Sequence, residues 1–156
     1  MDDLNFIYDD DSEELKNYES VFSQLVRITK DVLNINNSLS MSINYIKDEK
    51  SLELNKKYRN KDYIGDIISF PIDDDYGLYE QLDFREIGDI FITYQEAKRK
   101  ADQYNHDIKT EMCWLFVHGL LHILGYDHEL SDKDEEIMFA LTDKILNKIN
   151  VKYKIV

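Results

Sequence analysis

The chain has 156 residues, of which 43% are hydrophobic and 33% charged, a composition typical of a globular protein. This length favours a single domain, residues 1–156, with enough chain to bury a core. The formal net charge of −13 excludes indiscriminate nucleic-acid binding, so any contact with RNA requires a local basic patch, a metal ion or a partner.

The only cysteine is Cys113, so no intrachain disulfide can form and we expect a reducing compartment. It lies five residues before His118, roughly 140° around a helix, and we interpret it as core packing. No apolar run approaches the ~18 residues of a membrane span, and the N-terminus has no basic-then-apolar signal. We therefore expect a cytoplasmic protein that makes no contact with a membrane.

The first third of the chain predicts two strands and two helices. Residues 4–8 form a short apolar run typical of an edge strand. Ser12 is a candidate N-cap for a helix whose apolar residues recur at helical spacing. Those residues are Leu15, Tyr18, Phe22, Leu25 and Val26. Residues 41–45 alternate as in a half-buried strand, and residues 48–59 predict a short helix.

The densest basic cluster in the chain, Lys56–Lys61, lies at the end of that helix. As a pattern alone it indicates a solvated helix end, where cations are favoured. A strand over 67–70 follows and stops at Pro71. Residues 72–86 read as an acidic loop, and 87–93 as a strand buried on both faces.

Three helices complete the predicted elements. Thr93–Glu96 fits a capping box, which opens a helix that runs to about residue 104. His106 is expected on the surface, and Asp107 or Thr110 caps the next helix. Ser131 caps the last helix. Its predicted buried stripe is Ile137, Ala140, Leu141 and Ile145.

Three of the four histidines fall within residues 118–128. His118 and His122 are four apart, so on a helix both imidazoles leave the same face one turn apart and can share a cation. Gly125 stands where the helix would end in a left-handed residue, and the resulting turn would bring His128 in as a third ligand. Three protein ligands leave a fourth position for water, which is the arrangement of catalytic zinc sites.

A histidine pair at this spacing can also be two buried, hydrogen-bonded core residues. The third histidine and the glycine favour the metal over that alternative. In the H-E-x-x-H proteases, the residue after the first histidine is a glutamate that acts as general base, whereas here it is Gly119. The sequence therefore predicts a zincin-like helix that serves another reaction.

Three blocks of sequence together resemble the YbeY-like family of bacterial metal-dependent endoribonucleases, rRNA maturation factors. They are Leu54–Pro71, Gly88–Ile90 and His118–His128. The departure is Ile64-Gly65, where the family usually has Pro-Thr. The resemblance implies an α+β fold, in which several α-helices pack on a small mixed β-sheet.

The resemblance also implies one Zn²⁺ per chain, held by His118, His122 and His128. It makes Arg59, together with His118, a catalytic residue, which replaces the solvated-helix-end interpretation of the basic cluster. A guanidinium can hold a phosphate bidentately and stabilise the charge that develops on it during cleavage. Asp127 is open to two interpretations, as a residue that orients a ligand imidazole or as a surface aspartate in a turn.

The function that the resemblance implies is zinc-dependent, single-strand-specific endonuclease cleavage of RNA, a hydrolase reaction in rRNA processing and ribosome quality control. The implied partners are single-stranded ribosomal RNA and the ribosome, or its small subunit with associated proteins. Two alternatives stay open: a zinc-containing ribosome-assembly factor without nuclease activity, and a metal-dependent amidase or peptidase, against which Gly119 argues.

Overall fold

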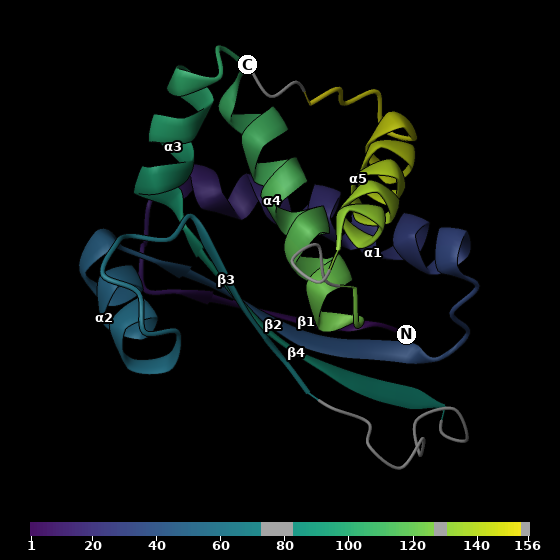
Figure 1. Cartoon of the computed structure of the whole chain (residues 1–156). Coiled ribbons are helices and arrows are strands. Elements are labelled where there is room, and N and C mark those ends of the chain that lie inside the picture. Colours follow the sequence, from purple (N-terminus) through teal and green to yellow (C-terminus); the bar gives the residue numbers. More distant parts are fainter. Residues whose placement is uncertain (73–82, 127–130, 154–156) are drawn as a thin grey trace.

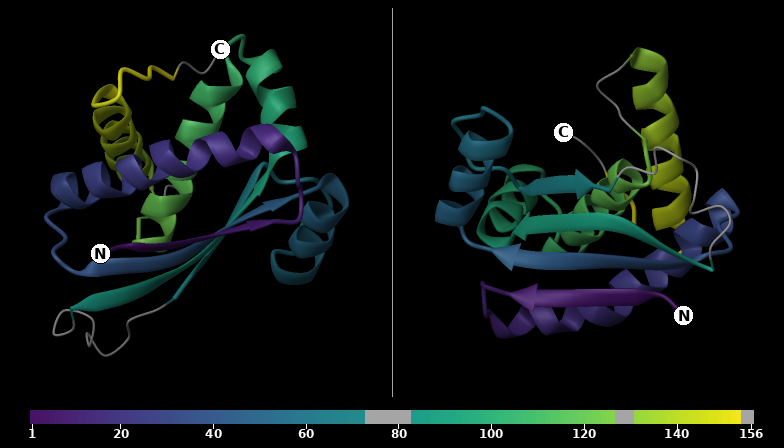
Figure 2. Two further views of the ribbon diagram at one scale, coloured as in Figure 1. Left: turned by 180° about the vertical axis from the view of Figure 1, so that it is seen from behind. Right: turned by 90° about the horizontal axis from the view of Figure 1, so that it is seen from below.

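A computed structural model of the chain describes residues 1–72, 83–126 and 131–153. Its strands form one sheet in the order β1-β2-β4-β3. β1 pairs parallel to β2 and β2 parallel to β4, whereas β3 runs antiparallel to β4, so the sheet is mixed. The strands are β1 (Asp3–Tyr8), β2 (Ser38–Ile46), β3 (Ile67–Pro71) and β4 (Phe84–Thr93). Figure 2 shows β1 and β3 at opposite edges.

Helices cover the two faces of this sheet unequally (Figure 1). The helices are η1 (Glu13–Asn17, a 3₁₀ turn), α1 (Tyr18–Leu33), α2 (Asp48–Tyr58), α3 (Tyr94–Gln103), α4 (Ile108–Ile123) and α5 (Asp132–Asn147). The main core lies between the sheet and the group α1, α3, α4 and α5. A small second cluster, in which Leu54 of α2 meets Ile46 and Ile68, covers part of the other face. The predicted α+β fold with a mixed sheet is confirmed.

β4 lies close to β3 and is covered on both faces. Gly88 has φ +139°, and a Cβ there would come within 2.2 Å of the Phe70 carbonyl oxygen, so only glycine fits. Ile90 packs into the main core, whereas Phe91 packs against the second cluster, as expected for a strand covered on both faces. β4 begins at Phe84 and not at residue 87, because Phe84 to Glu86 pair with the start of β2.

Two of the predicted N-cap residues form their cap hydrogen bonds, and two bond to other groups instead. Asp107 accepts from the Thr110 backbone N–H, and Ser131 from that of Asp134, as predicted. The predicted capping box at Thr93 is wrong, because the Thr93 hydroxyl donates to the Gly65 carbonyl instead. Ser12 caps nothing with its side chain, since its hydroxyl donates to Asp10.

The buried stripe predicted for α5 is only half right. Ile145 is buried and Leu141 packs against the core as predicted, whereas Ile137 and Ala140 are exposed. The other buried residues of α5 are Met138, Thr142 and Leu146. In the part of the chain that is described, no helix is both long enough and apolar enough to span a membrane.

Candidate metal and RNA site

The helix α4 carries the predicted metal ligands and ends as the sequence predicts. Gly125 has φ +108°, which an L side chain rarely adopts. The Gly125 N–H donates to the His122 carbonyl, and the Tyr126 N–H donates to that of Leu121, each at 3.0 Å. This pair of bonds is the Schellman motif, which satisfies the last carbonyls of the helix and turns the chain away from its axis.

The imidazoles of His118 and His122 lie together on one face of α4. Their ring centroids are 4.8 Å apart, and the ring planes are nearly perpendicular, at 78°. His118 is buried and His122 is half-buried. Zinc sites commonly take two imidazole nitrogens from histidines four residues apart on one helix. The two histidines present here therefore suit a zinc ion.

The third predicted ligand, His128, lies outside the described residues, as does Asp127. Within residues 1–72, 83–126 and 131–153, no group of three His, Cys, Asp or Glu side chains gathers as a metal site would. The structure therefore brings together two of the three predicted zinc ligands and leaves the third as a prediction.

A row of stacked rings leads away from His118, and the sequence reasoning missed it. The Trp114 ring stacks on His118 at 4.6 Å and 15°, and the Tyr153 ring in turn stacks on Trp114 at 4.6 Å and 20°. Trp114 lies one helical turn before His118, so the helical spacing that linked the histidines would also have found it. Tyr153 comes from the C-terminal segment, and only the tertiary structure brings it there.

A buried carboxyl closes the far end of this row. The Glu111 side chain is 1% exposed; it accepts from the Tyr153 hydroxyl at 3.2 Å and lies 3.0 Å from His106 Nε2. Burial raises the pKa of the Glu111 carboxyl above its ordinary value, and the hydrogen bond with His106 offsets part of that rise. His106 is thus a partly buried partner of Glu111, and its predicted surface position is wrong.

Gly119 lies where α4 presses against the sheet. A Cβ at this position would come within 2.5 Å of Ile67 Cδ1 and 3.3 Å of Ile90 Cδ1. Position 119 therefore points into packed side chains of β3 and β4, where a glutamate has neither space nor access to a substrate. The glutamate that serves as general base in the H-E-x-x-H proteases would therefore not fit at position 119.

Arg59 follows the last residue of α2, and the side chain of Asn55 holds it there. Its guanidinium Nη1 donates to Asn55 Oδ1 at 3.2 Å. α2 covers the opposite face of the sheet from α4 (Figure 1), so Arg59 and the two histidines lie on different sides of β3. Because β3 is an edge strand, Arg59 and the two histidines flank one open edge of the sheet.

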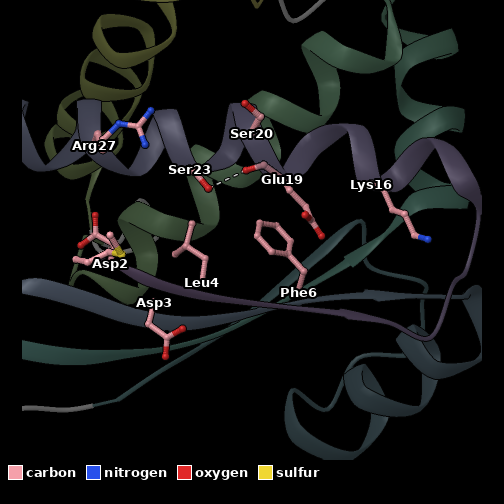
Figure 3. Close-up of a pocket in the computed structure, with 10 residues that line it drawn as sticks. Asp2, Asp3, Leu4, Phe6, Lys16, Glu19, Ser20, Ser23 and Arg27 are labelled. Atoms are coloured by element: carbon pink, nitrogen blue, oxygen red, sulfur yellow. Dashed lines mark hydrogen bonds between the residues drawn. The ribbon is translucent and has the colours of Figure 1, made fainter.

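Two other features of the described chain carry none of the predicted site residues. Cys113 is fully buried, and burial raises the pKa of its thiol to about 11, so it is core packing as predicted. A groove of about 920 Å³ lies between α1 and β1, at the far edge of the sheet from β3 (Figure 3). Leu4 and Phe6 point into it, and the charged side chains that line it include Asp2, Glu19 and Arg27.

Comparison with known proteins decides the family. Residues 6–150 match the family described as Endoribonuclease YbeY. This chain belongs to that family. A protein named Endoribonuclease YbeY from Mycoplasma capricolum is 43% identical over 150 residues, which cover 96% of this chain and 90% of that protein. One with the same name from Mesoplasma florum is 42% identical, covering 99% and 92%.

A solved structure supports the fold independently of close sequence similarity. The solution structure of TM1509 from Thermotoga maritima superposes with a TM-score of 0.60 at 21% identity, covering 94% of this chain and 91% of that one. At that identity the likeness concerns the arrangement of strands and helices. The resemblance that the three sequence blocks indicated is thereby confirmed at the level of the family and of the fold.

Proposed function

We propose that this chain is a zinc-dependent endoribonuclease, a hydrolase that cuts single-stranded RNA during ribosomal RNA maturation and ribosome quality control. Membership of the Endoribonuclease YbeY family supports the reaction class and makes RNA the substrate. The observation that carries the metal is the His118–His122 pair, with rings 4.8 Å apart on one helical face. The proposed substrate puts the enzyme at the ribosome, in the cytoplasm, with residues 1–156 acting as one domain.

His118, His122 and His128 would hold the ion. Zinc bound there supplies Lewis-acid activation of water and of a phosphoryl oxygen. The stack on Trp114 fixes the plane of the His118 ring, and packing of Gly119 on the sheet fixes the height of α4 above β3. Arg59, at the other side of the β3 edge, would hold a phosphate of the bound strand and stabilise the charge that builds up during cleavage.

The metal assignment is tested by elemental analysis of purified variants. We expect about one zinc per wild-type chain, a large loss of zinc in His122→Ala, and full zinc in Arg59→Ala. Arg99→Ala is the matched control, since Arg99 is an exposed arginine that pairs with Asp48 of α2 and Glu96 of α3. Full zinc occupancy in both His118→Ala and His122→Ala would reject these ligands.

The reaction is tested with labelled single-stranded and duplex RNA, with chelator and with zinc restored. Wild type should cut the single strand only when zinc is present, and His118→Ala should not cut. Arg59→Ala should retain its fold and lose about 10²- to 10³-fold in rate, as when one charge-stabilising donor is removed, whereas Arg99→Ala should cut normally. Equal products in every sample would mean contamination. An assembly factor without nuclease activity would associate with ribosomal subunits and leave both RNAs intact.

A further inference from the structure

Two tyrosine rings stand exposed within the basic segment at the end of α2, residues 56–63. Tyr58 is 58% exposed and Tyr63 is 51% exposed. Lysines 56, 57 and 61 and Arg59 surround them in the sequence. Exposed rings interleaved with cations are the surface that single-stranded nucleic acids bind, because bases stack on the rings while phosphates meet the cations.

One buried side chain holds this segment in a fixed shape. Asn55 is fully buried, and its Nδ2 donates to the Tyr63 carbonyl at 2.8 Å while its Oδ1 accepts from Arg59. The Asn55 carbonyl accepts from the backbone N–H groups of Arg59 and Lys61. Gly65 leaves room for this amide, since a Cβ there would come within 2.9 Å of Asn55 Nδ2. The rings are thus presented on a segment that is already ordered before a ligand binds.

Charge selects the ligand for this surface. Lys56 is paired with Asp62 at 3.3 Å, and Lys57 Nζ lies 5.2 Å from the centroid of the Tyr58 ring. Lys57, Arg59 and Lys61 then remain beside the rings as candidate phosphate contacts, in a chain whose net charge is −13. An anionic strand would be drawn to this segment and repelled from most of the remaining surface.

The same segment adjoins the strand that borders the histidine site. The Tyr58 ring packs edge-on against Phe70 of β3, with centroids 5.5 Å apart. The neighbouring residue Ser69 points to the other face, where a Cβ on Gly119 would lie 3.2 Å from its hydroxyl. Successive residues of β3 therefore touch the basic segment on one face and the zinc-site helix on the other.

We propose that Tyr58 and Tyr63 form a base-stacking platform that holds single-stranded RNA across the β3 edge, and so select single strands over duplex. This inference rests on the proposed function and deepens it, because it names the residues that would discriminate between the two forms of RNA. A duplex keeps its bases stacked on each other, so the rings gain nothing from it.

The test measures RNA binding in the presence of a chelator, so that it does not depend on zinc or on cleavage. Fluorescence anisotropy with a labelled 12-nucleotide single strand should show about tenfold weaker binding for Tyr63→Leu and a larger loss for Tyr58→Leu/Tyr63→Leu. Tyr63→Phe keeps the ring and should bind like wild type. Phe84→Leu is the matched control, because Phe84 is a 52% exposed ring at the start of β4.

A second probe separates stacking from general loss of the surface. A strand of the same length with abasic sugars should bind wild type and Tyr63→Leu equally, because it has no bases to stack. Thermal unfolding checks that Tyr58→Leu, which also loses its contact with Phe70, is still folded; Tyr58→Phe keeps that contact and should bind normally. Wild-type affinity of Tyr58→Leu/Tyr63→Leu for the ordinary strand would overturn the platform.

The outcomes distinguish the platform from the nuclease. Ring-dependent binding without any zinc-dependent cut would leave the platform in place and reject the proposed reaction. If zinc-dependent cleavage is seen but RNA binding does not depend on the two rings, the proposed reaction stands and the platform is rejected. Equal weakening of single-strand and abasic-strand binding in Tyr63→Leu would assign the effect to the backbone contacts and reject stacking.

Discussion

At the scale of single residues, Gly119 shows how a sequence departure acquires a structural meaning. Its spacing from His118 suggested only that the protease base is missing. The structure adds that α4 touches β3 and β4 at this point, where Ile67 Cδ1 is the nearest atom that a Cβ on residue 119 would meet. A glycine here sets the distance between the helix that bears the histidines and the sheet below it.

Gly119→Glu should destabilise the protein and create no peptidase. The substitution overpacks the interface and buries a carboxylate among apolar side chains, which together cost about 3 kcal/mol or more. The melting temperature should fall by about 6–12 °C. Gly119→Ala is the control: the gain of ~1 kcal/mol in helix propensity offsets the movement of the flexible Ile67 side chain, so its melting temperature should stay close to wild type. Differential scanning calorimetry and a peptide-cleavage screen measure both effects; a stable Gly119→Glu protein would contradict the packing.

At the scale of elements, α4 is defined by its two ends. Asp107 starts it and Gly125 ends it, so the register of the histidine face is set locally. The hydrogen bonds from Thr110 lower the pKa of the Asp107 carboxyl below its ordinary value of 3.8. A carboxyl whose pKa is lowered on folding stabilises the folded state above the unfolded pKa, and this contribution is lost as the pH falls through the folded pKa.

Unfolding of Asp107 variants should therefore depend on pH in a defined direction. At pH 7 we expect Asp107→Ala to lose about 1 kcal/mol, as is typical of a lost N-cap, with Asp107→Asn between it and wild type. As the pH falls below about 3.8, the free energy of unfolding of wild type should approach that of Asp107→Asn. The difference in free energy of unfolding between Asp107→Asn and Asp107→Ala should persist. Urea titrations at several pH values measure this, and a wild-type advantage that grows in acid would refute the assignment.

At the scale of the whole molecule, a net charge of −13 is combined with one dense cluster of cations at residues 56–61. If Lys57, Arg59 and Lys61 meet phosphates, the logarithm of the RNA binding constant should fall with the logarithm of salt concentration at a slope of about −2. Anisotropy titrations across a range of potassium chloride concentrations give this slope. A value of about −5 or steeper would require further cations and a different binding surface.

What the sequence predicted correctly was determined locally. The caps at Asp107 and Ser131 and the turn at Gly125 depend on residues within one helical turn, and the histidine spacing depends on a single helix. Ser12 is lost to its neighbour Asp10, but other errors arose where distant groups compete. The Thr93 hydroxyl is taken by Gly65, 28 residues away, and the Trp114 stack needs a tyrosine from the C-terminal segment.

The errors at Ile137 and Ala140 of α5 have a tertiary origin. The sequence of this helix is apolar enough on adjacent faces to allow either stripe, and contacts with α1 and α4 select the one that buries Met138 and Thr142. The partnership of His106 with Glu111 was likewise hidden, since five residues of sequence separation across a helix start indicate no contact. Local chemistry thus predicted the elements and the histidine face, whereas tertiary contacts determined the surroundings of that face.

The order of the strands along the chain has a consequence for synthesis on the ribosome. The four strands that the structure describes lie within residues 3–93, and the helix that bears the histidines begins only at Ile108. At ~5–20 residues per second, the residues of the sheet are synthesised seconds before the end of α4, which packs with Ile90 and Ile92 in the main core. A growing chain therefore cannot present both imidazoles to a metal until most of its residues have been made.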